Sequence, residues 1–350
     1  MKSPGAIPAP LHLKSACKAA DVVVNDMLEV QPHEEVLITA DFRTDPAVFH
    51  ALLDAVTLRG ARGAVMLIPQ LPCQGKLADP YIGRSIHSAV KSCDVWIDLT
   101  FPYLGGSEAH SNAMKEERVR CFLGADLSLA GFERMFAGVD IEALFQFQDA
   151  FDRIILEARG KRCRITNDRG TDIAFNLAET VTRKPRKTNM PGTFTPPGSV
   201  VIYPEMETVK GVVVFDAVLH EYQTLLADPI TVEVDSVIKT VSGGRSERFA
   251  LERALRRAAG AGLGQIIHFS YGFHPAARFT GQSFIEDVRV VGNNAVGLGV
   301  PWWLPGGGEN HPDGFMTMQT LEIDGRVHVK DGLVVYPEPL VEMQHALGVG

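Results

Sequence analysis

The order of short apolar strands and helices between residues 34 and 126 most constrains the fold of this 350-residue chain. Four apolar runs have the length of strands: 34–41, 63–69, 94–101 and 118–126. Asp45 and Pro46 predict the start of an intervening helix, because aspartate caps a helix N-terminus and proline suits its first turn. Short strands separated by helices are typical of a parallel sheet. We therefore expect residues 1–135 to form an N-terminal parallel α/β, Rossmann-like domain.

The remainder of the chain, residues 136–350, is mostly strand-like and is predicted to form a strand-rich α+β domain. An amphipathic helix near 140–158 leads into it. Two Asp-Gly pairs, Asp324-Gly325 and Asp331-Gly332, lie between alternating strands and are typical of hairpin turns. The overall prediction is an α/β protein whose chemistry lies in its second domain.

The segment 183–198 is basic and rich in proline and glycine. Such a composition is typical of a solvated connector, although this one is long enough to act as a lid. Neither G-x-G-x-x-G after a strand nor the P-loop sequence occurs in the chain, so the first domain is expected to be a scaffold.

The charge and apolar pattern exclude two classes of partner. There are 34 Lys and Arg against 42 Asp and Glu, which gives a net charge of −8 and argues against a nucleic-acid surface. No uninterrupted apolar run reaches the roughly 18 residues of a membrane span. Five scattered cysteines without a C-x-x-C pair indicate reduced thiols, so we expect a cytoplasmic protein.

The segment 264–279 carries the first candidate for metal chemistry. Its residues 265–270 have a strand pattern, so His268 and Ser270 are expected on one face and Phe269 on the other. The following Tyr271 and His274 are candidates for proton transfer or substrate orientation, as is Ser270. Phe273 is a candidate substrate contact.

The second candidate is the pair His311 and Asp313, two residues apart and preceded by three glycines. In an extended chain both side chains point the same way. Taken alone, this pair is more typical of a surface turn, because His-x-Asp is common by chance. Together with His268 it would form a face of two histidines and one carboxylate, which non-haem Fe²⁺ oxygenases use. Zn²⁺ with three protein ligands and a water is the competing occupant.

Trp302 and Trp303 stand just before the glycine run. They are candidates for an aromatic wall against a flat substrate, and core packing explains them equally well.

Five segments of the sequence resemble those of a known family. In chain order they are 170–172, 196–205 (PPGSVVIYPE), 266–275 (IIHFSYGFHP), 293–299 (NNAVGLG) and 306–316 (GGGENHPDGFM). Their order resembles the thermophilic-type metallo-aminopeptidase superfamily, and within it the branch of the 2,5-dihydroxypyridine 5,6-dioxygenases. The resemblance covers most of the chain and is specific in the last third.

The peptidase branch of that superfamily holds two metal ions, largely with acidic ligands. Here Ser199 and His268 stand where two glutamates would be, and Ala295 or Val296 stands where a strand histidine would be. The match is direct only at His311 and Asp313, and the loss of the other three ligands, two of them acidic, favours the dioxygenase branch. The resemblance thus implies a single Fe²⁺ held by His268 and this pair.

The resemblance further implies O₂-dependent opening of a small hydroxylated pyridine or aromatic ring. The family's pocket histidines are replaced here, and Tyr103 or His110 is the expected substitute, so a different ring from 2,5-dihydroxypyridine is an open alternative. A homo-oligomer is also expected.

Two other classes of function stay open at this point. One is a metal-dependent aminopeptidase or amidase that uses the same ligands on Zn²⁺ or Co²⁺. The other is a non-enzymatic protein that keeps the fold and binds a ligand or partner.

Overall fold

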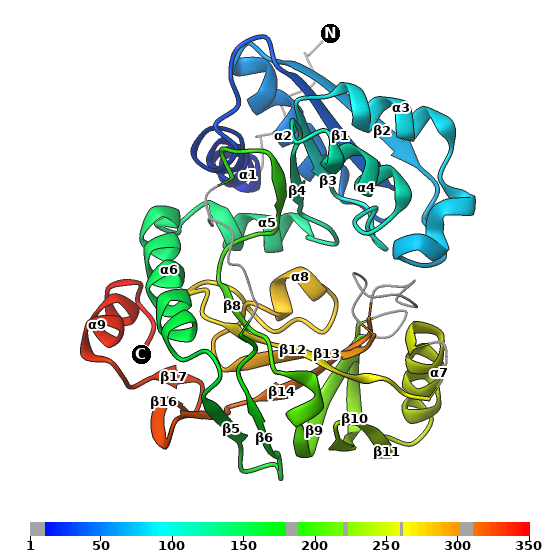
Figure 1. The fold of residues 1–350 in the computed structure, drawn as a ribbon. Coiled ribbons are helices and arrows are strands. Elements are labelled where there is room, and N and C mark those ends of the chain that lie inside the picture. The colour runs from blue at the N-terminus through cyan, green and yellow to red at the C-terminus, as the bar shows by residue number, and fades with distance from the viewer. Residues whose placement is uncertain (1–10, 180–187, 220–222, 260–261, 301–310) are drawn as a thin grey trace, which may run out of the picture.

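A computed structural model describes residues 11–179, 188–219, 223–259, 262–300 and 311–350 of the chain (Figure 1). The described residues form two sheets, one of five strands and one of twelve. The smaller sheet lies in the upper part of Figure 1 and the larger one in the lower part. The fold is α/β, as the sequence predicts.

The first sheet is parallel throughout and has the order β2-β1-β3-β4-β7. Its strands are β1 (Glu35–Asp41), β2 (Arg62–Ile68), β3 (Val95–Asp98), β4 (Arg120–Leu123) and β7 (Gly192–Phe194). The accompanying helices are α1 (Leu11–Asp21), α2 (Pro46–Leu58), α3 (Arg84–Ser92), α4 (Glu108–Lys115) and α5 (Leu129–Phe136), with a π-helix at Val22–Met27 and a 3₁₀ helix at Gly75–Tyr81.

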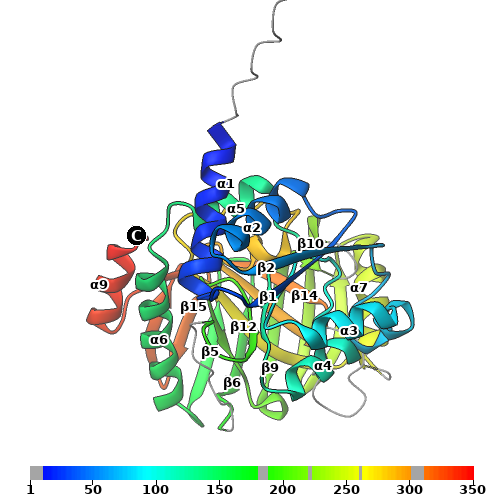
Figure 2. The ribbon, with the colours of Figure 1, turned by 90° about the horizontal axis from the view of Figure 1, so that it is seen from above.

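Helices cover both faces of this sheet, which explains its nearly continuous apolar runs. Ile38 and Ile97 pack on the side of α1, α2 and α5. Leu37 and Trp96, one residue away in each strand, pack on the side of α3 and α4. Figure 2 shows the two sets of helices on opposite sides of β1 and β2.

The fifth strand of the first sheet comes from an unexpected part of the chain. β7 pairs in parallel with β4 although β5 and β6 of the second sheet precede it in sequence. Within the expected connector 183–198, the described residues 188–198 therefore contain a sheet strand. Thr188 is buried and donates a hydrogen bond to the Met27 carbonyl. A division of the chain after residue 135 stays a prediction.

The second sheet is antiparallel and strongly curled. Its order is β17-β16-β15-β5-β6-β9-β14-β13-β12-β8, and β10 and β11 extend it from β9. The strands are β5 (Arg162–Thr166), β6 (Asp172–Asn176), β8 (Ser199–Ile202), β9 (Lys210–Leu219), β10 (Gln223–Asp235), β11 (Val237–Gly243), β12 (Gln265–Gly272), β13 (Asn293–Gly299), β14 (Asp313–Thr317), β15 (Thr320–Ile323), β16 (Arg326–Lys330) and β17 (Leu333–Val334). Its helices are α6 (Ile141–Glu157), α7 (Glu247–Ala259), α8 (Phe284–Asp287) and α9 (Glu338–Ala346), with a 3₁₀ turn at Met206–Thr208.

Both predicted Asp-Gly turns are present, between β15 and β16 and between β16 and β17. Asp324 and Gly325 have φ values of 50° and 79°, and Asp331 and Gly332 have 50° and 80°. Two consecutive positive φ angles are the requirement of the tight hairpin turn that Asp-Gly favours.

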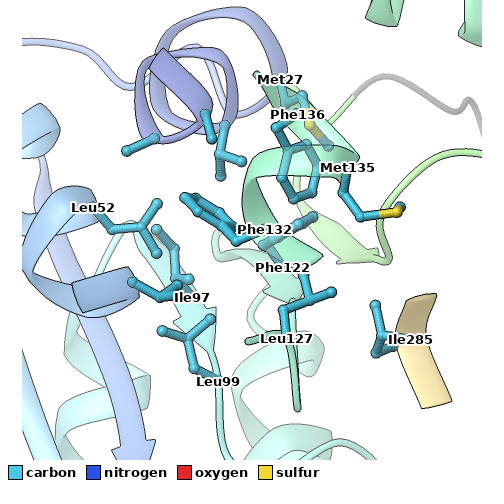
Figure 3. Close-up of a cluster of buried hydrophobic side chains, with 14 of the residues drawn as sticks. Met27, Leu52, Ile97, Leu99, Phe122, Leu127, Phe132, Met135, Phe136 and Ile285 are labelled. Atoms are coloured by element: carbon cyan, nitrogen blue, oxygen red, sulfur yellow. The ribbon is translucent and has the colours of Figure 1, made fainter. Parts of the chain in front are cut away.

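An apolar core and a set of polar contacts join the two sheets. Figure 3 shows Ile285 of α8 near Leu127 and Met135, and all three side chains belong to one buried cluster. Asp126, which follows β4, accepts hydrogen bonds from the backbone N–H groups of Phe284 and Ile285 at the start of α8. Helix α8 is thereby fixed against the end of the first sheet.

None of the helices in the described part of the chain combines the length and apolar composition that crossing a membrane requires.

Candidate metal centre

The register of the second sheet aligns the candidate ligands on one face. His268 on β12 is paired with Gly297 on β13, and Gly297 is paired with Asp313 on β14. Residues paired across antiparallel strands point to the same side of a sheet. The small Gly297 therefore lies between the two ligand strands, and the side chains of His268 and Asp313 rise on either side of it.

The structure brings together the three residues expected to bind a metal. The Nε2 atoms of His268 and His311 are 2.8 Å apart. The Asp313 carboxylate oxygens lie 3.7 Å from Nε2 of His268 and 3.8 Å from Nε2 of His311. Among the described residues, these three form the one group of His, Cys, Asp and Glu side chains close enough to share an ion.

Burial keeps these groups uncharged when no ion is bound. It raises the pKa of Asp313, which is 2% exposed, to about 8. It lowers the pKa of His311 to about 4. Burial also lowers the pKa of His268 well below its usual value, with a smaller contribution from His311, while the neighbouring Ala295 backbone acts in the opposite direction.

The donor set fits a divalent transition-metal ion. Metal–ligand bonds of about 2.1 Å allow two donors on one ion to be at most ~4.2 Å apart. The two Nε2 atoms are 2.8 Å apart, Asp313 Oδ1 is 3.7 Å from His268 and Asp313 Oδ2 is 3.8 Å from His311, so each pair is within that limit. Asp313 Oδ1 and the Nδ1 atoms of His268 and His311 are buried without a hydrogen-bond partner among the described residues. Unpaired buried polar atoms are costly, so an ion that engages this carboxylate would relieve part of that cost. Imidazole nitrogen and carboxylate suit Fe²⁺, Co²⁺ and Zn²⁺ alike.

Tyr203 is a neighbour of the centre that sequence reasoning missed. Its ring meets the His268 ring edge to face, with centroids 6.2 Å apart. It directly follows β8, whose Ile202 is paired with Phe269, so its position is set by the strand next to β12. Its place in the motif 196–205 is the only sequence signal that points to it.

The predicted proton-transfer residues on β12 divide between the two faces of the strand. Ser270 is paired with Ala295 and lies on the His268 face, two pairing positions along. Tyr271 is fully buried in the opposite core and stacks with Phe273. Phe273 is itself 1% exposed and packs against α6. Catalysis by Tyr271 and substrate contact by Phe273 stay predictions.

His274 is buried where the second sheet meets α5. Its Nδ1 accepts hydrogen bonds from the backbone N–H groups of Ala276 and Ala277. Its Nε2 lies 3.0 Å from the Met135 carbonyl and therefore donates a hydrogen bond to it. Both ring nitrogens are used within the fold, and burial lowers the pKa of His274 to about 4.

Tyr103 and His110 lie beside the first sheet. Nδ1 of His110 accepts a hydrogen bond from the Gly106 backbone, and its Nε2 is 2.8 Å from the Thr193 hydroxyl on β7. Tyr103 packs beside Phe101, with ring centroids 6.5 Å apart. Trp302 and Trp303 lie outside the described residues.

Three comparisons with known proteins extend these observations. The family model described as NicX: 2,5-dihydroxypyridine 5,6-dioxygenase matches residues 23–336. No curated protein sequence matches the chain. The structure of 2,5-dihydroxypyridine dioxygenase from Pseudomonas putida KT2440 is similar over 94% of this chain and 99% of that chain, with a TM-score of 0.76 and 18% identity.

A second solved structure shares the fold. Wild-type AmpT from Thermus thermophilus is similar over 92% of this chain and 99% of its own, with a TM-score of 0.63 and 16% identity. Both structural likenesses concern the fold, whereas the family model covers most of the sequence. The resemblance inferred from the sequence is thus confirmed, and the chain belongs to the 2,5-dihydroxypyridine 5,6-dioxygenase family.

Proposed function

We propose that this protein is a mononuclear non-haem Fe²⁺ dioxygenase that opens a small hydroxylated pyridine or aromatic ring, 2,5-dihydroxypyridine-like, with O₂. Family membership supports a dioxygenase-like role. The observation that carries the finer proposal is the convergence of His268, His311 and Asp313. Two histidines and one carboxylate on one side of an ion are the ligand set of non-haem Fe²⁺ oxygenases.

In this proposal the three side chains hold the ion and the surrounding sheet keeps it dry. A ferrous ion in such a set supplies redox chemistry and open coordination positions. The T-shaped contact with Tyr203 packs against the His268 ring and helps to fix its orientation, as outer partners of metal-binding histidines commonly do.

Proton transfer and substrate contact are further parts of the proposal. Ser270 lies on the face of the metal ligands, which supports a role in orienting substrate or moving a proton. For Tyr103 and His110 we propose the role of the family's pocket histidines. His110 would first have to give up its contact with Thr193. Trp302 and Trp303 are proposed as an aromatic wall.

A metal-dependent hydrolase of the aminopeptidase or amidase type, with Zn²⁺ or Co²⁺ on the same ligands, is the alternative. The donor chemistry of His268, His311 and Asp313 admits these ions. A two-ion peptidase centre needs further carboxylates. Among the described residues, Asp313 is the only carboxylate in the cluster, which favours the one-ion dioxygenase.

The deciding experiment compares the two chemistries in the same preparation. The full-length protein is purified without oxygen and loaded with Fe²⁺, and O₂ uptake is measured with a panel of dihydroxypyridines and catechols. Peptide and amide hydrolysis is measured after loading with Co²⁺ or Zn²⁺. We expect O₂ uptake with at least one ring substrate, and none in the His311→Ala variant. Hydrolysis without any O₂ uptake would replace the proposal by its alternative.

We further propose that the enzyme is a cytoplasmic homo-oligomer with a small-molecule substrate and no nucleic-acid partner. All five cysteines are free, which supports a reducing compartment. Light scattering after gel filtration measures the oligomeric state, and a monomer at micromolar concentration would contradict this part.

A further inference from the structure

Gly297 has no backbone reason to be glycine. It is a buried residue within β13, and its φ angle lies outside the left-handed region that favours glycine. Glycine inside a strand weakens it, since glycine has no side chain to pack and orders at a higher entropic cost. The missing side chain at this position therefore needs a different explanation.

The surroundings of Gly297 supply that explanation. A Cβ atom added here would lie 2.5 Å from Nε2 and 2.6 Å from Cδ2 of His268. It would also lie 2.9 Å from Cδ2 of His311. All three nearest atoms thus belong to the rings of two candidate ligands, and one of them is a donor atom. Even a methyl group at this position would enter the space that the donors face.

We propose that Gly297 is a positioning residue that keeps the floor of the metal centre free of side-chain atoms, an inference that rests on the proposed metal site. Gly297 is paired with His268 on one side and Asp313 on the other. Neighbouring strands are spaced about 4.8 Å apart. His268 on β12 and Asp313 on β14 can therefore reach a common ion only if position 297 on β13, between them, carries no side chain. Any larger residue at position 297 displaces the imidazole rings.

The inference predicts loss of metal binding without loss of the fold. The atoms that a Cβ would meet lie at the ends of histidine side chains, which can rotate away. The situation at Gly314 is different, because a Cβ there would lie 2.4 Å from the Phe215 ring in the core. We therefore expect the Gly297→Ala variant to fold, with the imidazole rings of His268 and His311 held in positions that no longer converge on one ion.

The test uses Co²⁺ as a spectroscopic probe of full-length, metal-depleted protein. Wild type should bind one ion per chain, with ligand-field absorption bands of nitrogen and oxygen donors. Gly297→Ala should bind Co²⁺ about 100-fold more weakly, at the upper end of the effect of disturbing groups that orient metal ligands. The matched control is Gly138→Ala, because Gly138 is exposed and its added Cβ would meet no atom within 4 Å. This control should bind as wild type does.

The possible results separate the inference from the proposed function. If wild type binds no Co²⁺, Fe²⁺ or Zn²⁺, the proposed metal site fails and the inference fails with it. If wild type binds and Gly297→Ala binds within threefold of it, with the same bands, the site stands and the inference is overturned.

A second variant covers the case in which Gly297→Ala does not fold. His268→Gly combined with His311→Ala removes both rings that the new methyl group would meet. Adding Gly297→Ala to this pair of substitutions should then leave the stability to urea unchanged. If the triple variant is unfolded while the protein with the pair is folded, the added Cβ clashes elsewhere and the inference is wrong.

Discussion

The Nε2 atoms of His268 and His311 face one another at 2.8 Å across 43 residues of sequence. Both rings are neutral at pH 7, since burial lowers both pKa values. Without an ion, the N–H of one ring must donate a hydrogen bond to the bare nitrogen of the other, and this contact leaves Asp313 Oδ1 without a partner. Binding of a divalent ion would replace that contact by three metal–ligand bonds.

Replacing any one ligand is expected to abolish metal binding and leave the fold intact. The sharpest variant is Asp313→Asn, because the carboxyl group, with a pKa of about 8, is already uncharged at pH 7. Its amide substitute should change the metal-free unfolding free energy by less than about 1 kcal/mol. Free metal at 100 times its Kd should raise the unfolding free energy of wild type by about 2.7 kcal/mol and should leave that of the variant unchanged. Urea unfolding with and without Co²⁺ measures both, and a variant that is equally stabilised by Co²⁺ contradicts the ligand assignment.

The ion pair between Arg134 and Glu286 should be critical for joining the two sheets. Its two hydrogen bonds are 2.7 and 2.8 Å long, and the Glu286 side chain is 1% exposed. Arg134→Met leaves that carboxylate buried without its partner, which should cost about 3 kcal/mol of unfolding free energy.

The matched control for this pair is Arg164 and Asp172, which form the same two-bond geometry at 2.8 and 2.7 Å. These side chains are more than half exposed, so Arg164→Met should leave the urea midpoint nearly unchanged. Equal effects of the two substitutions would mean that burial does not determine the strength of the pair at α8.

His274 should make the protein sensitive to acid. Its pKa is about 4 in the folded protein against an ordinary value of 6.5, so between these values the unfolded chain binds more protons. Stability should therefore fall as the pH drops from about 6.5 to 4, by up to about 1.4 kcal/mol per pH unit. The main physical reason is that burial disfavours the charged ring. In addition, Nδ1 accepts two backbone N–H groups and cannot take a proton without breaking both bonds.

The measurement is urea unfolding at several pH values between 7 and 4.5, for wild type and His274→Asn. The asparagine offers an oxygen to the backbone of Ala276 and Ala277 and does not titrate. It should be less stable than wild type at pH 7 and should have a flatter pH dependence. Parallel curves for the two proteins would assign the acid sensitivity to other groups.

Asp45 should contribute more stability than an ordinary helix cap. One of its oxygens accepts a hydrogen bond from Ala47 in α2, and the other accepts one from Leu129 at the start of α5. Asp45→Ala should cost about 2 kcal/mol, the upper end for a cap, against about 1 kcal/mol for Asp140→Ala, which caps α6 alone. Thermal melts of both variants check the difference, and equal losses would show that the bond to α5 contributes nothing.

Local patterns were sufficient to predict most elements that position the site. Asp45 and Pro46 start α2 as predicted, because capping and the fixed φ of proline depend only on neighbouring residues. Alternation along β12 placed His268 and Ser270 on one face, which the pairing with Gly297 and Ala295 confirms. The convergence of His268 with Asp313 could be expected from their place in one strand-rich domain and from the family resemblance, and it depends on β13 lying between their strands.

The features that could not be predicted depend on contacts between distant segments. β7 has only three residues and no periodicity, so nothing in its sequence indicates a partner in β4. The sequence around His274 resembles a site loop, while the bond to the Met135 carbonyl that fixes its ring comes from α5. The role of Tyr203 likewise depends on the register of β8 against β12.

Strand β7 follows β5 and β6 in the sequence, and this order has a consequence for synthesis on the ribosome. The first sheet obtains its edge strand from residues 192–194, after the chain has already supplied β5 and β6 to the second sheet. A nascent chain that ends before this point exposes the open edge of β4 to other chains. Fragments cut between the halves should therefore aggregate, and any attempt to transplant the N-terminal half alone must carry a substitute for this strand.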